Sequence, residues 1–334
     1  MERVTAYVTA VHRGRYELET EGKRFFGRLK AAEFLYHGGE AVYPTVGDWV
    51  EADRQEQGDS VIRKVLPRKS VFMRLNSTQG QPDQAVAANF DYVFVVMSLN
   101  RDFHVTKLER YLTVAWQSGG IPVIVLSKAD QCPDAGDFLA RAGKAAPGTD
   151  ILCLSAKTGE GMEALEPFLG KGKSVVLLGS SGVGKSSLIN VLLGSEVMET
   201  GAIREYDSQG RHTTTHRQCF LLPDRIRLPG GREIDAGARI IDTPGMRMLQ
   251  VSDFEQGAGN AFEDVETLAA QCRFRDCSHG KEPGCAVKAA IADGRLPVKK
   301  WNNYLSMKKE AEYAKKRAEI IAKKQSRGKR AYKE

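Results

Sequence analysis

The first 68 residues alternate polar and apolar positions over short runs that turn residues separate. Five of these runs are predicted as β-strands, at residues 4–11, 15–20, 24–29, 46–52 and 60–65. Alternation with a period of two is typical of a strand that buries one face and exposes the other. Five short strands joined by tight turns indicate a small closed barrel. We expect this barrel to form a domain over residues 1–68.

The barrel pattern suits the oligonucleotide/oligosaccharide-binding (OB) type, which commonly carries single-stranded nucleic acid on one face. Arg24, Phe26 and Arg28 share one face of the third predicted strand and are expected to be exposed. These basic and aromatic side chains could contact RNA. A barrel with a purely structural role is the alternative, because small barrels serve many functions.

Between residues 69 and 250 the pattern changes to apolar runs of strand length that alternate with helical stretches. Strands are predicted at residues 91–99, 122–126, 150–154, 174–178, 220–222 and 238–241, and helices at residues 105–117, 138–144, 162–169 and 187–193. Near-continuous apolar strands are typical of parallel sheets that helices cover on both faces. The alternation therefore predicts a three-layer α/β sandwich with right-handed crossovers.

Residues 179–186 read Gly-Ser-Ser-Gly-Val-Gly-Lys-Ser and fit the phosphate-loop (P-loop) pattern. They lie between a predicted strand and a predicted helix, where free backbone N–H groups and the helix dipole attract phosphate. Lys185 would reach the β- and γ-phosphates, and the Ser186 hydroxyl would ligate Mg²⁺. The predicted phosphate-binding residues are Gly179, Ser180, Ser181, Gly182, Val183, Gly184, Lys185, Ser186 and Ser187.

Three further motifs follow predicted strands, at residues 127–130 (Ser-Lys-Ala-Asp), 155–157 (Ser-Ala-Lys) and 242–245 (Asp-Thr-Pro-Gly). Ligands bind at the carboxyl ends of the strands in such sheets. A carboxylate at position 130 can accept two hydrogen bonds from guanine, from N1–H and the 2-amino group, and adenine offers no such pair. The predicted base-binding residues are Ser127, Lys128, Ala129, Asp130, Ser155, Ala156 and Lys157.

Each of these motifs has a distinct expected role. Lys128 can cover the plane of the base, and the Ser155-Ala156 turn can offer a backbone N–H to guanine O6. Asp242 can support the Mg²⁺ shell, and the Gly245 N–H can sense the γ-phosphate. Together the motifs predict a guanine-nucleotide site with bound GTP or GDP and Mg²⁺.

Three of the six cysteines crowd around one histidine, in the order Cys272, Cys277, His279 and Cys285. Three thiolates and one imidazole make a closed tetrahedral Zn²⁺ site, which is structural because no position stays open for water. We expect one zinc ion per chain. A redox cluster or a set of buried cysteines is the alternative.

The base motifs precede the phosphate loop, so the motif order resembles that of GTPases in circularly permuted form. With the barrel before it and the Cys/His cluster after it, this order is similar to the ribosome small-subunit-dependent GTPase family (RsgA/YjeQ), over about residues 1–300. The resemblance implies a circularly permuted P-loop GTPase that acts in late maturation of the small (30S) ribosomal subunit. It also implies that rRNA is bound and that the subunit stimulates GTP hydrolysis.

The resemblance carries one departure and leaves one choice open. Ser127 stands where the family usually has Asn or Thr, which predicts a somewhat weaker guanine affinity. Residues 210–217 hold the first switch, in which one threonine should bind Mg²⁺ and the γ-phosphate. Thr214 and Thr215 are the candidates. An exposed polar loop is the alternative.

Hydrolysis of GTP requires a residue that orients the attacking water. No Gln follows Gly245 in the Met-Arg-Met sequence at 246–248, which predicts a low intrinsic rate. His212 is the first candidate for positioning water and His216 the second. With these, the predicted catalytic residues are His212, Lys185, Thr214 and Thr215.

The pattern becomes helical from about residue 251, which predicts a zinc-binding domain at 251–300 and a basic helical tail at 301–334. From Lys299 to Glu334 there are 13 Lys and Arg against 4 Asp and Glu, so the tail accounts for the whole net charge of +7. A helix is predicted at 302–324 and disorder at 325–330. Trp301 and Tyr304 are expected to help the tail bind RNA. A solvated helix face is the alternative.

No apolar run approaches the roughly 18 residues of a membrane span. We therefore expect a cytoplasmic protein without a membrane partner. We also expect it to be a monomer. Two other functions stay open at this point. One is an RNA-binding scaffold that binds nucleotide and barely hydrolyses it. The other is a P-loop ATPase or kinase, against which Asp130 argues.

Overall fold

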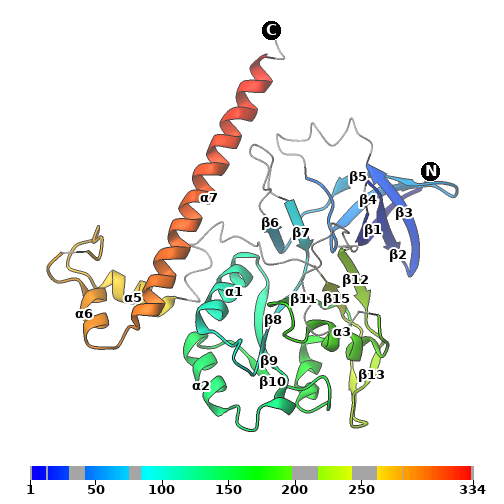
Figure 1. Ribbon diagram of the computed structural model, residues 1–334. Coiled ribbons are helices and arrows are strands. Elements are labelled where there is room, and N and C mark those ends of the chain that lie inside the picture. The colour runs from blue at the N-terminus through cyan, green and yellow to red at the C-terminus, as the bar shows by residue number, and fades with distance from the viewer. Residues whose placement is uncertain are drawn as a thin grey trace, which may run out of the picture.

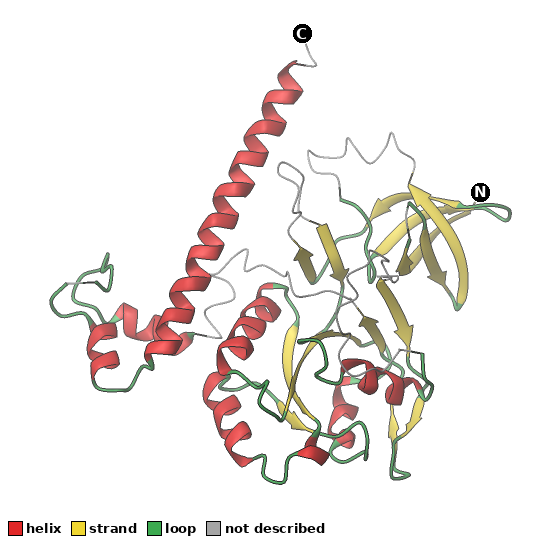
Figure 2. Cartoon of the chain, in the orientation of Figure 1, coloured by secondary structure: helices red, strands yellow, loops and turns green. Residues whose placement is uncertain are grey.

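A computed structural model describes residues 2–12, 14–29, 42–74, 84–197, 217–242, 262–280 and 282–331. Figures 1 and 2 show a barrel, an α/β sandwich and a C-terminal helical part that ends in one long helix. The barrel comes first in the sequence, and the long helix comes last. The candidate sites lie in the sandwich and at the base of the long helix.

The barrel consists of β1 (Glu2–Val11), β2 (Tyr16–Thr20), β3 (Lys23–Leu29), β4 (Trp49–Arg54) and β5 (Ser60–Val65). The strands follow the order β1-β2-β3-β5-β4, and pairing of β1 with β4 closes the barrel. The strands β3 and β5 run parallel, and the other neighbours run antiparallel. Alternate side chains fill the interior, so the predicted five-stranded barrel is confirmed.

The sandwich contains one sheet with the strand order β10-β9-β8-β11-β15-β12. Its strands are β8 (Tyr92–Ser98), β9 (Ile121–Ser127), β10 (Ile151–Cys153), β11 (Ser174–Leu178), β12 (Arg217–Leu221) and β15 (Arg239–Asp242). The first five strands in that order are parallel, and β12 pairs antiparallel with β15. The helical segments are α1 (Val105–Gln117), η1 (Ala129–Gln131), α2 (Gly136–Ala145), η2 (Met162–Phe168) and α3 (Lys185–Leu193).

The sheet buries both of its faces. On β8, Val93, Val95 and Met97 join the apolar core that includes α1, whereas Phe94 and Val96 join the core that includes α3. Alternation between two cores explains why the strand reads as a continuous apolar run. The predicted three-layer arrangement is confirmed.

Some elements differ from the sequence prediction. The segment predicted as a helix at 162–169 is a 3₁₀ helix, η2, which contains Pro167. Two hairpins were not predicted, and each has short strands. They are β6 (Val71–Arg74) with β7 (Gln84–Ala88), and β13 (Arg225–Arg227) with β14 (Glu233–Asp235).

The barrel and the sandwich share one 11-stranded sheet because β1 also pairs with β12, with Ala10 opposite Gln218. Arg239 on β15 supports this junction. Its guanidinium forms a 2.8 Å ion pair with Glu19 and lies 4.6 Å from the centre of the Tyr7 ring. The barrel is therefore attached to the two strands that carry Arg217 and Asp242, next to the predicted switch segments.

The C-terminal part contains α5 (Glu263–Ala270), α6 (Ala286–Ala292) and α7 (Val298–Ala331). We refer to residues 262–331 as the C-terminal module. The prediction of disorder at 325–330 is wrong, because α7 continues to Ala331. Among the described helices, none combines the length and apolar character that a membrane span needs.

The expectation that Trp301 and Tyr304 stack on RNA is also wrong. Only 9% of Trp301 and 7% of Tyr304 is exposed. The two rings stack on each other at 5.5 Å, and Tyr304 packs edge-on against Phe262. They belong to the core that joins α7 to the rest of the module.

Candidate nucleotide site and metal centre

The phosphate loop connects β11 to α3, as predicted. Gly182 and Gly184 adopt φ values of +78° and +97°, in the left-handed region that favours glycine. A side chain at position 179 would come within 2.4 Å of the Val96 carbonyl oxygen. The Lys185 ammonium donates hydrogen bonds to the carbonyl oxygens of Gly179 and Ser180, at 2.8 and 2.7 Å. The glycines are thus required for the tight path of the loop, two of whose carbonyl oxygens bind the Lys185 ammonium.

The two predicted base-binding turns form one connected unit. Asp130 lies in η1, and its Oδ1 accepts a 2.6 Å hydrogen bond from the hydroxyl of Ser155. The same Ser155 oxygen accepts from the backbone N–H groups of Lys157 and Thr158, each at 3.2 Å. Ser155 is fully buried, whereas Asp130 is exposed. A fixed serine therefore orients a carboxylate that faces water.

Ser127 connects this unit to the phosphate loop. Its hydroxyl lies 2.6 Å from the Val183 carbonyl oxygen and 3.2 Å from that of Met97. A hydroxyl has one proton to donate, and the shorter contact is to the loop. The next residue, Lys128, has a φ of +63°, which turns the chain out of β9 into η1.

The strands set these groups along one edge of the sheet. The phosphate loop follows β11, and Ser127 and Asp242 are the last residues of β9 and β15, which run parallel to β11 in the same sheet. Val176 on β11 pairs with Ile241, the neighbour of Asp242. The structure thus brings together the predicted residues that it describes. The predicted residues His212, His216, Thr214, Thr215 and Gly245 lie outside the described residues.

The four predicted metal ligands also come together. Their ligand atoms all lie within 4.8 Å of one another. His279 Nδ1 is 3.5 Å from the sulfur atoms of both Cys272 and Cys285, which are 3.9 Å from each other. Ligands placed 2.0–2.3 Å from a zinc ion at tetrahedral angles are about 3.5–3.8 Å apart. The donor set and its spacing therefore fit zinc.

The surroundings of His279 suit metal binding. Burial lowers the pKa of its ring, so the neutral form that coordinates metals is favoured. The Trp301 ring packs edge-on against it at 5.3 Å. Cys285 caps α6, where its sulfur accepts a hydrogen bond from the Lys288 N–H. The cluster thus links the loop between α5 and α6 to the start of α7.

A protein-family model described as RsgA GTPase matches residues 65–252, which is more than half of the chain. The chain belongs to the RsgA GTPase family. This membership confirms the predicted enzyme class, a GTPase.

Curated RsgA relatives match almost the whole chain. One from Listeria monocytogenes, named small ribosomal subunit biogenesis GTPase RsgA 2, is 46% identical over 94% of this chain and 86% of its own length. A relative of the same function name from Methanosarcina acetivorans is 40% identical over 83% of this chain and 72% of its own length.

Solved structures support the fold. YjeQ from Thermotoga maritima matches with a TM-score of 0.63 and 28% identity, over 93% of this chain and 99% of that one. YloQ, described as a circularly permuted GTPase, matches with a TM-score of 0.58 and 23% identity, over 93% of this chain and 96% of that one. The predicted fold class, a permuted GTPase sandwich with an OB-type barrel and a C-terminal helical part, is confirmed.

One residue at the site of this RsgA-family chain was missed by sequence reasoning. The Tyr111 hydroxyl on α1 lies 3.0 Å from the Ser180 hydroxyl in the phosphate loop. Tyr111 does not follow a strand and belongs to no motif. Its position in a predicted helix did not indicate a contact with the phosphate loop. A polar aromatic residue on a core-facing helix is the only hint that the sequence offers.

The Ser127 contact leads to a testable prediction. Ser127→Ala removes the hydrogen bond to Val183 and should weaken GDP binding about fivefold, which is the worth of one typical hydrogen bond. Ser127→Thr keeps the hydroxyl and should bind GDP within about twofold of the original chain. Isothermal titration calorimetry with GDP measures both. Equal affinity in all three proteins would show that the contact contributes nothing to nucleotide binding.

Proposed function

We propose that this RsgA-family protein hydrolyses GTP on the small (30S) ribosomal subunit during late maturation of that subunit. The observation that carries the proposal is the convergence of three motifs at one sheet edge. Ser127 hydrogen-bonds the phosphate loop, and Ser155 hydrogen-bonds Asp130, so base site and phosphate site are one structure. The function names of the curated relatives support the ribosomal assignment.

In this proposal the guanine base lies against the two turns. Asp130 accepts from guanine N1–H and the 2-amino group, Lys128 covers the base plane, and the Ser155-Ala156 turn donates to O6. The hydrogen bond from Ser155 keeps the carboxylate in the orientation that this double contact needs. Such a carboxylate does not favour ATP, because adenine has no matching pair of donors for it to accept from.

The phosphates lie on the loop at 179–186. Lys185 exchanges its contacts with the loop carbonyls for contacts with the β- and γ-phosphates. Ser186 and Asp242 lie on neighbouring segments at the same sheet edge and would hold Mg²⁺, which neutralises phosphate charge. The Gly245 N–H and one of Thr214 and Thr215 sense the γ-phosphate.

The C-terminal module holds one structural zinc ion per chain, with Cys272, Cys277, His279 and Cys285 as ligands. Four protein ligands leave no open position, so the ion supports the module and takes no part in hydrolysis. The ligands lie between α5 and α6, and His279 packs against Trp301 at the start of α7, so the ion would also support the base of the long helix.

RNA contacts come from the barrel and from α7. Arg24, Phe26 and Arg28 are exposed on β3, in the phase that the sequence predicts. The Arg15 guanidinium lies 3.8 Å from the centre of the Phe26 ring, so basic and aromatic groups adjoin there. The exposed lysines of α7 add phosphate contacts whose strength falls as salt rises.

The organisation that we propose follows the predicted boundaries. Residues 1–68 form the barrel, 69–250 the permuted GTPase domain, 251–300 the zinc-binding domain and 301–334 the basic helical tail. We further propose that the protein acts as a monomer in the cytoplasm. Sedimentation of the purified chain tests the monomeric state.

A direct experiment measures GTP turnover with purified 30S subunits, with 50S subunits and with neither. We expect a low rate alone and with 50S subunits, and a rate at least about tenfold higher with 30S subunits. Competition between GTP and ATP for the same site identifies the base. No stimulation by 30S subunits, with tight GTP binding, would favour a nucleotide-binding RNA scaffold instead.

His212→Ala tests the water-positioning role. We expect 30S-stimulated turnover to be about 10²-fold slower, because the attacking water is no longer positioned by the imidazole. GTP affinity should stay within about twofold, since the side chain is assigned to the attacking water and not to the nucleotide. His216→Ala is the matched control and should lower the rate less. Unaltered turnover in His212→Ala would rule out this role.

A further inference from the structure

Three consecutive residues on α1 contact two separate parts of the molecule. Arg110 forms a bidentate ion pair with Glu310 of α7, with N–O distances of 2.7 and 2.8 Å. Glu109 accepts a 2.7 Å hydrogen bond from Asn303 of α7. Tyr111 contacts Ser180 of the phosphate loop at 3.0 Å. Successive helix residues are about 100° apart, so one helix turn contacts α7 on one side and the loop on the other.

Burial shows that α7 is firmly seated at this interface. Glu109 is only 2% exposed, and burial raises the pKa of its carboxyl group. Asn303 partly offsets that burial by its hydrogen bond. A buried carboxylate is costly without partners, so Glu109 depends on α7 for the hydrogen bond from Asn303.

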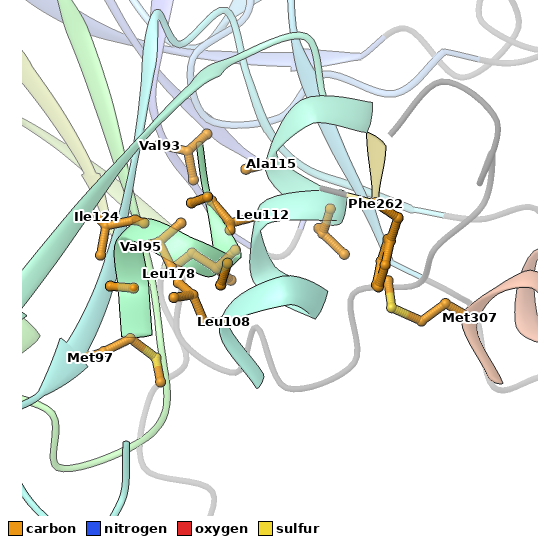
Figure 3. Close-up of a cluster of buried hydrophobic side chains, with 14 of the residues drawn as sticks. Val93, Val95, Met97, Leu108, Leu112, Ala115, Ile124, Leu178, Phe262 and Met307 are labelled. Carbon is orange, nitrogen blue, oxygen red and sulfur yellow. The ribbon is translucent and has the colours of Figure 1, made fainter. Parts of the chain in front are cut away.

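Apolar side chains reinforce the same contact. Phe262 is 0% exposed and Met307 of α7 is 1% exposed. Figure 3 shows these two side chains next to each other near α1, and both belong to the apolar cluster that includes Leu108 and Leu112 of α1. The C-terminal module is thus docked on α1 by an apolar patch with an ion pair and a buried hydrogen bond beside it.

The residue that Tyr111 contacts is part of the phosphate-binding machinery. The Ser180 carbonyl oxygen accepts a hydrogen bond from the Lys185 ammonium. Ser127 holds the other end of the loop at Val183. A loop with left-handed glycines at 182 and 184 has little rigidity of its own, so these side-chain contacts set its shape.

We propose that Tyr111 is a positioning residue for the phosphate loop and that docking of α7 on α1 holds Tyr111 in place. Nucleotide release is then slow while the C-terminal module is docked and faster when the module leaves α1. The coupling is reciprocal, so bound nucleotide also strengthens docking. This inference rests on the proposed guanine-nucleotide site.

The experiment measures the dissociation rate of a fluorescent GDP analogue from full-length, zinc-loaded protein by stopped flow. Tyr111→Phe, which removes only the hydroxyl, should raise the rate about three- to tenfold. Glu310→Arg faces Arg110 with a like charge and should raise the rate by a similar factor, although it lies outside the nucleotide site. Met307→Lys undocks α7 by a different route, because it buries a charge in the apolar patch.

The charge exchange separates coupling from general damage. Arg110→Glu combined with Glu310→Arg restores the ion pair in reverse and should return the rate to within about twofold of the original. The matched control is Glu312→Arg, which makes the same charge change at an exposed position on the same helix and should leave the rate unchanged. Recovery in the double variant is a result that a merely structural defect would not give.

Each outcome has one meaning. Faster release in Tyr111→Phe and in both undocking variants, with recovery in the double variant, supports the proposal. If Glu310→Arg and Met307→Lys release GDP at the original rate, the coupling is overturned. If Tyr111→Phe does so, the positioning role is overturned. Failure of the unmodified protein to bind GDP would instead overturn the proposed function, and this inference with it.

Discussion

Replacing Asp130 with asparagine is expected to lower GTP affinity by about a hundredfold or more and to raise the affinity for the xanthine nucleotide XTP. The carboxylate offers two acceptors to guanine, whereas the amide offers one acceptor and one donor. The amide N–H₂ would face the guanine 2-amino group, leaving two donors opposed and unpaired. Xanthine carries a carbonyl oxygen at that position and accepts from the amide.

The structure indicates that the side chain at position 130 can keep its orientation when the carboxylate is replaced by an amide. The Ser155 hydroxyl lies 2.6 Å from Asp130 Oδ1 and can either donate or accept, so it can hold an amide in the same place. Competition of GTP, XTP and ATP against a fluorescent GDP analogue measures the three affinities. Asp137→Asn is the matched control, since Asp137 is an exposed carboxylate on α2 that pairs with Arg141. Unchanged GTP affinity in Asp130→Asn would mean that Asp130 does not read the base.

Much of this site could be predicted because its parts are local in sequence. The glycines, Lys185 and Ser186 form one continuous run between a strand and a helix, and the strand-end rule places Asp130 beside them. The same holds for the metal cluster, whose four ligands lie between residues 272 and 285. In both cases the residue types in one short segment indicate the ligand directly, so the prediction does not depend on knowing the rest of the fold.

The parts that could not be predicted depend on long-range packing. Trp301 and Tyr304 lie in a basic stretch and look exposed in the sequence, but they cover His279 and Phe262. The contact of Tyr111 with Ser180 joins residues 69 positions apart, and that of Arg110 with Glu310 joins residues 200 positions apart. Periodicity shows which face of a helix is apolar. It does not show which partner covers that face.

The two hairpins were not predicted because their strands are short. β6 and β7 have four and five residues, and β13 and β14 have three each, which is too few to show a clear alternation of polar and apolar positions. The hairpin of β6 and β7 contacts Arg217, the first residue of β12. Its guanidinium donates to the Ala85 carbonyl oxygen of β7 at 3.2 Å. The strand that follows the predicted first switch is thereby anchored to the hairpin as well as to the barrel.

Cys277→Ala is expected to reduce bound zinc from about one ion per chain to near zero and to unfold the zinc-bearing loop and α6. Structural zinc contributes roughly 10–16 kcal/mol of folding free energy in small zinc-finger peptides. A module as small as this one has too small a core to replace that contribution. Zinc content by elemental analysis and cleavage by trypsin at Arg273, Arg275 and Lys288 measure the two effects.

The control for this variant is Cys132→Ala, which removes a partly buried thiol outside the cluster and should keep zinc at about one ion per chain. Retained zinc in Cys277→Ala would exclude Cys277 as a ligand. Lost zinc with an unchanged trypsin pattern would show instead that the module folds on its own core. The expected result has a further consequence, because His279 packs against Trp301 at the start of α7. A module without zinc should dock poorly on α1, and its GDP release should match that of Glu310→Arg.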